Sequence, residues 1–383
     1  MLPAPHRLLV HLLLCCPLLV RPAPGPAPLD IAFTPEPVGP ASRRSPVVIS
    51  EIHYNPGPRL DGLDTEFVEI RNTEPFSADI GGFRLSGEVA YTFPPGTVLG
   101  PTGLVVVARN PVQLEAATGL TGVLGPYAGS LGNDGGNLRL RHRNRDAILF
   151  EVTYNDRAPW PVAADGAGSS LVLQRPSYGM SDPRAWGASS LVGGSPGQPE
   201  SVAADALDAV EINEIAAGFV ELFHGARDPI ALSGCALADA AVTNQHLFAP
   251  GTTLAGGAYL SVPAASLPFP LTVAGGRILL FNPAATRVLD ARVFDPTLGT
   301  TSHGITGSGE WAVLASPTPA AANAPRERPV VITEIHFHPM SDNPAEEWIE
   351  LHNPGALSVD LDGWRLDGEV SFTFPPGVTL PAD

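Results

Sequence analysis

The chain has 383 residues, of which 44% are apolar, so it is long enough for two or three domains and too apolar to be disordered throughout. Its 40 glycines and 42 prolines favour short strands joined by turns over long helices. Its 22 basic and 39 acidic residues give a formal net charge of −17, which disfavours nucleic acid and anionic membranes and favours divalent cations or basic partners.

The first 27 residues have the pattern of a secretory signal peptide. Arg7 provides the positive charge, a mostly apolar stretch follows it, and small residues up to Ala27 provide a cleavage site. The segment 28–46, rich in proline and alanine, is interpreted as a linker. We therefore expect a secreted protein, extracellular or in the cell envelope. After cleavage Cys235 is the one cysteine left, so the mature chain cannot form an internal disulfide.

One sequence pattern occurs three times along the chain. Val47 opens the first copy with V-V-I-S-E-I-H-Y, and Val330 opens the last with V-V-I-T-E-I-H-F. Both copies continue through E-F-V-E-I-R-N or E-W-I-E-L-H-N and reach F-P-P-G. A degenerate copy begins at Val210 with V-E-I-N-E-I. These repeats predict three modules, at 47–199, 208–323 and 329–383.

Within the first copy, runs of alternating or continuous apolar residues predict strands at 47–54, 67–71, 104–108, 138–141, 148–154 and 170–173. A period of two places Ile52 on one face of the first strand and Ile49 and Glu51 on the other. Residues 114–118 are the one candidate for a helical turn. Strands at this spacing indicate a sandwich or barrel. The first two copies end in G-S-P-G and S-P-T-P-A, proline-rich stretches interpreted as linkers.

The first copy resembles the lamin tail domain family, in the form found in secreted bacterial proteins. The residues that carry the resemblance are I-S-E-I, F-V-E-I-R-N, D-I-G-G-F-R-L at Asp79, F-P-P-G-T at Phe93, and D-G-A-G-S-S-L at Asp165 after a Trp-Pro pair. The resemblance covers nearly all of 47–197, is weaker over 208–323, and extends to 329–383 for the first half of the domain. It implies an all-β fold of tandem immunoglobulin-like β-sandwiches, with the last one incomplete, no catalytic activity and a role in interactions.

The third copy supplies about four strands, whereas the first uses roughly 150 residues. A sandwich that lacks its second half exposes an apolar face and open strand edges. We therefore expect that the chain is a fragment of a longer protein, or that its last segment packs poorly.

Two glutamates recur at the same strand positions in every copy. They are Glu51 and Glu69, then Glu214 and Glu221, then Glu334 and Glu350. Neighbouring carboxylates suit Ca²⁺ or acid–base catalysis. The candidate calcium ligands in the first module are Glu51, Glu69, Asp64 and Glu66. The structural alternative is a cross-strand ion pair with Arg84 or Arg365, but the second copy has Ala236 at this position and keeps both glutamates.

Two further sets of polar residues invite a functional interpretation. His53 lies near Asp61, Asp64 and Glu66 in a loose metal-ligand pattern, for which a solvated loop is the competing interpretation. Four arginines spaced by two residues would share one face of an extended strand and form an anion-binding stripe. They are Arg139, Arg141, Arg143 and Arg145. The competing interpretation is a solvated outer face, which the net negative charge favours.

The sequence as a whole indicates a secreted, non-catalytic interaction or adhesion protein whose partner is an unknown protein or a cell-surface polysaccharide. One alternative is an accessory region of an extracellular hydrolase or spore-coat-kinase-like enzyme with its catalytic domain beyond Asp383. Another is an envelope structural protein stabilised by calcium. No cofactor other than calcium is indicated.

The signal peptide gives a direct prediction about the mature protein. Because signal peptidase cuts after small residues, the exported chain is expected to begin near Pro28 when its N-terminus is determined by mass spectrometry. A secreted product that begins at Met1, or a lipid-modified Cys15 or Cys16, would contradict this prediction.

Overall fold

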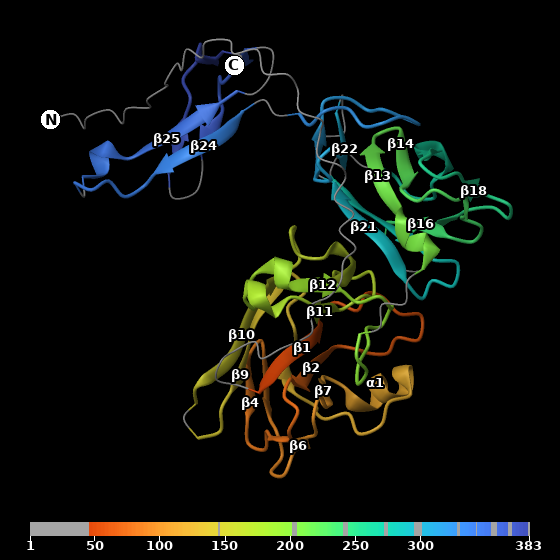
Figure 1. Ribbon diagram of the computed structural model, residues 1–383, viewed down its shortest axis with the longest axis vertical. Helices are drawn as coiled ribbons and strands as arrows, with labels where there is room; N and C mark the ends of the chain where they lie inside the picture. The colour runs from red at the N-terminus through yellow and green to blue at the C-terminus, as the bar shows by residue number, and fades with distance from the viewer. Residues whose placement is uncertain are drawn as a thin grey trace. The chain divides into compact units, whose positions relative to one another are not determined.

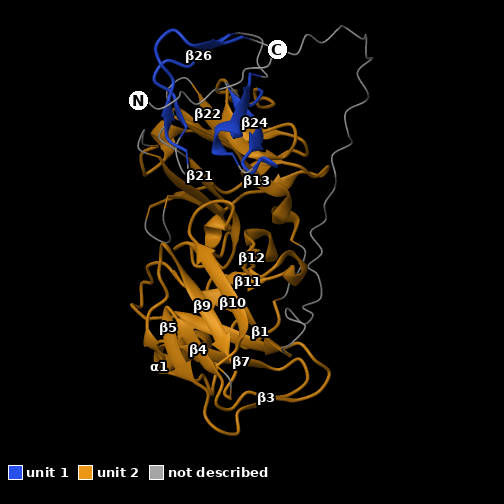
Figure 2. Cartoon of the chain, turned by 90° about the vertical axis from the view of Figure 1, so that its left-hand side faces the viewer, with its two compact units in different colours: residues 1–30, 325–383 blue, residues 31–324 orange. Residues whose placement is uncertain are grey.

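A computed structural model describes residues 46–144, 146–200, 205–239, 244–271, 275–294, 301–327, 330–341, 343–353, 358–366 and 370–381. The described residues fall into two compact units, divided between residues 324 and 325 (Figure 2). The unit that ends at residue 324 contains two β-sandwiches, and the unit that begins at residue 325 contains a set of short two-stranded sheets. The predicted all-β fold is confirmed.

The first sandwich has two antiparallel five-stranded sheets, in the orders β12-β11-β1-β2-β7 and β10-β9-β4-β5-β8, with a small β3-β6 pair beside them (Figure 1). Its strands are β1 (Val47–His53), β2 (Phe67–Asn72), β3 (Ala78–Asp79), β4 (Arg84–Gly87), β5 (Val89–Thr92), β6 (Val98–Leu99), β7 (Leu104–Ala108), β8 (Ala128–Gly129), β9 (Gly135–Arg141), β10 (Ile148–Asn155), β11 (Leu171–Leu173) and β12 (Trp186–Ala188). In sequence, β1 and β11 are far apart, yet they are neighbours in one sheet.

The structure corrects the prediction of which β1 residues point to the same face of the sheet. The pairing of β1 with β2 is interrupted by a bulge between Ile49 and Glu51, which takes up one extra residue, Ser50. As a result Ile49 and Ile52 both belong to the core, although a strict period of two assigned them to opposite faces. Both side chains are fully buried.

The one α-helix of the described residues is α1 (Pro111–Thr118), longer than the predicted helical turn. The side chain of Asn110 accepts a hydrogen bond from the backbone N–H of Gln113, and Pro111 occupies the first turn, where its missing N–H costs nothing. Gly119 ends the helix in a left-handed conformation (φ 75°). Leu114 is its buried anchor against β7.

The second sandwich repeats the strand order of the first, with sheets β19-β14-β13-β22-β23 and β17-β16-β20-β21 and a small β15-β18 pair. Its strands are β13 (Val210–Ala216), β14 (Phe219–His224), β15 (Ile230–Ala231), β16 (Ala236–Ala238), β17 (Gln245–Leu247), β18 (Thr253–Leu254), β19 (Tyr259–Pro263), β20 (Gly276–Phe281), β21 (Val288–Phe294), β22 (Ser302–Ile305) and β23 (Trp311–Leu314). Thus β13, β14 and β22 take the places of β1, β2 and β11. Cys235 is a free, fully buried core residue.

The unit after residue 324 contains the pairs β24-β25, β26-β29 and β27-β28. Its strands are β24 (Val331–His336), β25 (Trp348–His352), β26 (Val359–Asp360), β27 (Arg365–Leu366), β28 (Phe372–Thr373) and β29 (Thr379–Leu380). A small core forms around Leu361, Phe374 and Leu380. By sequence and pairing, β24 and β25 correspond to β1 and β2.

Short 3₁₀ helices connect the strands at Val162–Ala164, Pro176–Tyr178, Pro183–Ala185, Ala206–Ala209, Ala264–Ser266 and Pro344–Glu346. Across the described parts of the chain, no helix combines the length and the apolar character needed to cross a membrane.

The two equivalent isoleucines Ile52 and Ile335 give a matched test of the fold. Ile52 is fully buried, whereas Ile335 is 57% exposed. Ile52→Ala is expected to lower the free energy of unfolding of the first sandwich by about 2–5 kcal/mol, because it leaves a cavity. Ile335→Ala is expected to change the stability of its unit by less than about 0.5 kcal/mol. Denaturant-dependent hydrogen exchange of β1 and β24 measures both, and equal losses would contradict this assignment.

Candidate functional site

The recurring glutamates lie directly opposite each other on adjacent strands. Glu51 pairs with Glu69 across β1 and β2, and the equivalent glutamates pair across β13-β14 and across β24-β25. In each hairpin a bulge immediately precedes the first glutamate, at Ser50, Asn213 and Thr333. The three hairpins therefore present the same pair of carboxylates in the same register.

In the first module both glutamates are buried, each only 2% exposed. Their carboxylates accept hydrogen bonds from the C-terminal segment of the module. The Ser195 N–H donates to Glu51 Oε1 at 2.8 Å, and the Gly197 N–H donates to Glu69 Oε2 at 2.8 Å. Ser170, which comes just before β11, donates its hydroxyl to Glu51. The bulge residue Ser50 donates to Glu69 Oε1 at 2.6 Å.

The second module has the same arrangement built from different residues. The Thr318 N–H and hydroxyl donate to Glu214 at 3.1 and 3.0 Å, and the Ala320 N–H donates to Glu221. Ser302 at the start of β22 donates to Glu214, as Ser170 does to Glu51.

We name this arrangement the glutamate clasp: two opposed glutamates, a serine at the neighbouring strand, and a closing tripeptide, Ser195-Pro196-Gly197 or Thr318-Pro319-Ala320. The stretches that contain these tripeptides were interpreted from sequence as linkers, and that interpretation is wrong. Their backbone N–H groups are the donors that satisfy buried carboxylates, and burial without such donors would cost several kcal/mol. The clasp therefore fastens the end of each sandwich to its first hairpin.

The Ser195 hydroxyl contacts two carboxylates at the first clasp. It donates toward Glu51 Oε2 at 3.1 Å and toward Glu200 Oε2 at 2.8 Å. The single hydroxyl proton is therefore shared between these two acceptors. Burial, and next the negative charge of Glu69, raise the pKa of Glu51 to about 8. Burial raises the pKa of Glu69 to about 7.

Gly194 allows the closing segment to approach this carboxylate. It has a φ of 76°, and a Cβ at this position would lie 2.3 Å from Glu51 Oε1. A residue with a side chain would therefore be both strained and in collision with the clasp.

In the third hairpin the same glutamates face solvent. Thr333 donates to Glu350 Oε1 at 2.6 Å, as Ser50 does to Glu69. However, Glu334 is exposed and Glu350 is half-buried. The described residues of this unit place no closing tripeptide on the pair, and every proline from 330 to 383 follows a residue other than serine or threonine.

The other predicted calcium ligands, Asp64 and Glu66, are bound by protein donors. Arg109 forms ion pairs with both, at 2.9 Å to Glu66 Oε2 and at short range to Asp64. The Tyr127 hydroxyl and the Leu131 N–H each donate to Glu66 Oε1 at 2.7 Å. Within the part of the chain that the structure describes, no group of three or more His, Cys, Asp or Glu residues is arranged to hold a metal ion. Arg84, the predicted ion-pair partner of the clasp glutamates, instead pairs with Asp146.

His53 does not belong to a solvated loop, so that interpretation is wrong. It ends β1 and is 1% exposed, against the Phe67 ring. Its Nδ1 lies 2.9 Å from the carbonyl oxygen of Thr65, and its Nε2 lies 3.2 Å from that of Gly168. Burial lowers the pKa of His53 to about 4, so the ring is neutral at physiological pH.

The arginines in β9 and just after it are paired with acidic residues. Arg139 binds Glu151 at 2.7 Å, Arg141 lies 3.4 Å from Asp146, and Arg143 binds Asp79 at 3.0 Å. Arg145, the fourth predicted member of the stripe, lies outside the described residues. These pairs neutralise much of the positive charge that an anion-binding stripe would need.

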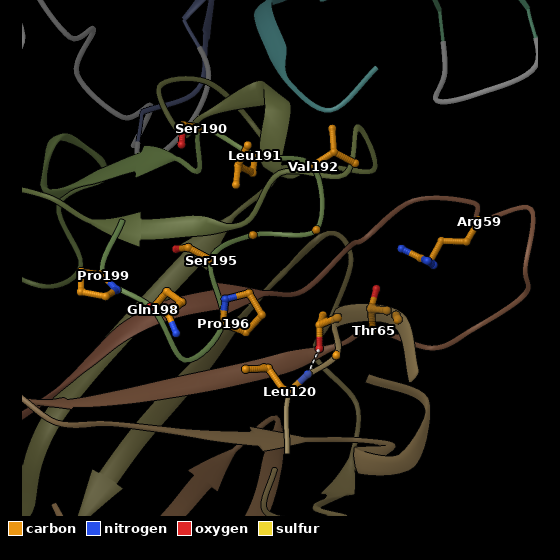
Figure 3. A pocket seen from close by; sticks show the side chains of 15 residues that line it. Arg59, Thr65, Leu120, Ser190, Leu191, Val192, Ser195, Pro196, Gln198 and Pro199 are labelled. Atoms are coloured by element: carbon orange, nitrogen blue, oxygen red, sulfur yellow. Dashed lines mark hydrogen bonds between the residues drawn. The ribbon is translucent and has the colours of Figure 1, made fainter. Parts of the chain in front are cut away.

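A cleft of about 470 Å³ lies beside the first clasp. The segment Ser190–Pro199 forms one wall, Arg59 lies across from it, and Thr65 and Leu120 lie below (Figure 3). Arg59 is held in place by a hydrogen bond to Asp61 at 2.9 Å. The cleft is lined mostly by small and apolar groups and shows no arrangement typical of a catalytic centre.

Residues 40–156 and 323–383 match the family model of the lamin tail domain. The immunoglobulin-like fold of that family agrees with the sandwiches described above and indicates a protein-interaction module. The second sandwich lies outside the matched residues, although its strand order is that of the first sandwich. No curated protein matches the chain.

Sequence reasoning found the clasp glutamates through their recurrence but missed the donors that bind them. These are Ser170, Ser195, Gly197, Ser302, Thr318 and Ala320. The signal was present as a Ser/Thr-Pro-Gly/Ala tripeptide near the end of both complete modules.

The raised pKa values predict how stability depends on pH. A carboxyl group whose pKa is higher in the folded state stabilises that state fully below its unfolded pKa, and the contribution is lost as the pH rises through the folded pKa. The first sandwich is therefore expected to lose stability between pH 4.5 and about 8, at up to about 1.4 kcal/mol per pH unit. Glu51→Gln, which mimics the protonated form, is expected to reduce this slope.

The control is Glu88→Gln, at an exposed carboxylate of the same sandwich. It should leave the slope unchanged. Urea denaturation from pH 4.5 to 8.5 measures each slope, and an identical slope for wild type and Glu51→Gln would show that the pKa of Glu51 is not raised in the folded state.

Proposed function

We propose that this chain is an exported, non-catalytic interaction protein of the secreted bacterial type, in which lamin tail modules present binding surface. The observation that carries the proposal is the match of residues 40–156 and 323–383 to the lamin tail domain, whose immunoglobulin-like fold indicates a protein-interaction module. A candidate surface is the apolar face of the third hairpin. Ile332, Ile335 and Phe337 are 52%, 57% and 77% exposed. An apolar face of this kind on a folded unit is typical of a protein-interaction surface.

The first module shows that this face has a partner when the sandwich is complete. Ile49, Ile52 and Tyr54 occupy the equivalent positions in β1 and just after it, and each is at most 1% exposed. They pack in the core with residues of the opposite sheet, such as Leu138 and Val152. Among the described residues, the third hairpin exposes apolar side chains whose equivalents are buried in the first module.

The acidic residues support a binding role over a catalytic one. In both complete modules the paired glutamates accept hydrogen bonds from a closing peptide segment and are shielded from solvent. General acid–base catalysis needs a carboxyl group within reach of a substrate, and these groups face the interior of their own sandwich. The net charge of −17 favours a protein or neutral polysaccharide partner over a nucleic acid.

A photo-crosslinking amino acid placed at Phe337 tests the interaction surface. The full chain, expressed in the cells that produce it, is expected to form a covalent adduct there, because Phe337 is the most exposed of the three apolar side chains. Val112, which is 75% exposed on the first module, is the matched control position. Mass spectrometry identifies the adduct as polypeptide or polysaccharide. Equal labelling at both positions, or no adduct at Phe337, would contradict the proposal.

A further inference from the structure

The outer face of one sheet in the second module is apolar and buried. In β16 and β20, Leu237 and Leu280 belong to the core of the sandwich. The residues that alternate with them belong to a separate apolar cluster, and each is at most 3% exposed. They are Ala236, Ala238, Leu279 and Phe281. An antiparallel sheet in a sandwich commonly turns its outer face to solvent, so burial of both faces means that a further layer of protein covers this sheet.

The equivalent face of the first module is polar. Strand β4 pairs with β9 as β16 pairs with β20, so the two faces can be compared position by position. The matching cross-strand pairs are Arg84–Arg141 and Ser86–Arg139 in the first module, and Ala236–Phe281 and Ala238–Leu279 in the second. Three arginines and a serine are thus replaced by apolar residues in the same register. Such a replacement is typical of a surface that binds protein.

The covering layer is the loop 165–168 of the first module, which lies in the same compact unit as the second module. Ala167 is 1% exposed and packs in one cluster with the four residues of the apolar face. Beside it, Arg277 of β20 donates to the carbonyl oxygen of Asp165, and the same guanidinium lies 3.2 Å from the Asp165 carboxylate. The Val192 N–H of the first module donates to the carbonyl oxygen of Thr286 at 2.8 Å.

The loop is held in place by its own module. Asn55, just after β1, donates its side-chain N–H to Asp165 Oδ1 at 2.6 Å, and its carbonyl oxygen accepts from the Gly166 N–H at 2.9 Å. Gly166 has a φ of 67°, and a Cβ at this position would lie 3.1 Å from the Arg277 guanidinium. A side chain here would be strained and would crowd the arginine. The loop therefore offers a preformed acceptor to which Arg277 fits closely.

We propose that the apolar outer face of the second module is a docking surface for the first module, and that the two sandwiches move as one rigid body with Arg277 bound to the loop 165–168. This docking explains why Ala236 stands where the other two copies have Arg84 and Arg365, because an arginine at 236 would place a charge in an apolar contact. The binding surfaces of the two modules are then fixed relative to each other.

Hydrogen exchange of the Val192 amide in the full chain tests the docking, because the acceptor of this amide lies in the other module. Mass spectrometry with fragmentation along the backbone measures the exchange rate. Leu279→Arg, which gives the second module the residue type of the first, is expected to raise this rate about tenfold or more, because it opens the contact. Arg277→Ala removes one partly exposed ion pair and is expected to raise the rate about threefold.

Two matched controls stay within the second module. Thr253→Arg adds an arginine at an exposed position, and Arg292→Ala removes an arginine whose ion pairs with Glu211 and Asp290 lie inside that module. Both should leave the exchange of Val192 as in the wild type. The amides of β13 report whether the second module is folded, and they should stay protected in all four variants.

The proposal is overturned if Val192 exchanges at the wild-type rate in both Leu279→Arg and Arg277→Ala, or if the controls accelerate it equally. Loss of protection in β13 would show that Leu279→Arg unfolds the second module. In that case Arg277→Ala decides alone, since its side chain lies outside the apolar cluster: faster exchange of Val192 supports the docking, and an unchanged rate rejects it.

Discussion

The first two modules depend on one constraint, which is the burial of two opposed carboxylates between adjacent strands. Such a pair is tolerated only where hydrogen-bond donors surround it. Each module draws these donors from its own far end, more than 85 residues along the chain from the first glutamate. Burial of the carboxylates in the first hairpin is therefore unfavourable until the last strands have folded against it. The same hydrogen bonds join the two halves of the sandwich.

The second module shows which features this constraint preserves. It has alanine in place of Arg84 and lacks the Trp-Pro segment, yet it retains both glutamates and all three kinds of donor. Its bulge residue is Asn213, which donates to Glu221 at 2.9 Å and exchanges further hydrogen bonds with Asn323. The donor chemistry is thus kept while the identity of individual residues varies.

Much of the fold could be predicted from the sequence because strands leave a local signal. The alternation at 47–54 and the apolar run at 104–108 correspond to β1 and β7, and the run at 170–173 contains β11. The bulge at Ser50 could not be predicted, since one extra residue in a strand leaves the apolar pattern nearly intact. The same is true of His53, whose burial depends on a carbonyl 115 residues away.

The candidate site was predicted only in part, for a related reason. Recurrence identified the glutamates because they lie inside matching blocks of sequence. Their donors lie in short proline-rich stretches whose composition is also that of a linker, so composition alone led to the wrong interpretation. The distinction depends on where the backbone N–H groups point, and this is a property of the folded chain.

The long separation between the halves of each clasp affects how the protein is made. Ser195 lies 144 residues after Glu51, and Thr318 lies 104 residues after Glu214, so during synthesis each first hairpin emerges well before the segment that closes it. Pairings so distant in sequence form slowly. For that interval a ribosome-bound chain carries open acceptor hairpins that resemble one another, and a closing segment from one module fits, in its main-chain donors, the hairpin of another. Tandem repetition of the clasp therefore makes exchange of strands between modules the characteristic error of assembly for this chain. In the second module Asn213 also exchanges hydrogen bonds with Asn323, a contact that ties this hairpin to its own closing segment.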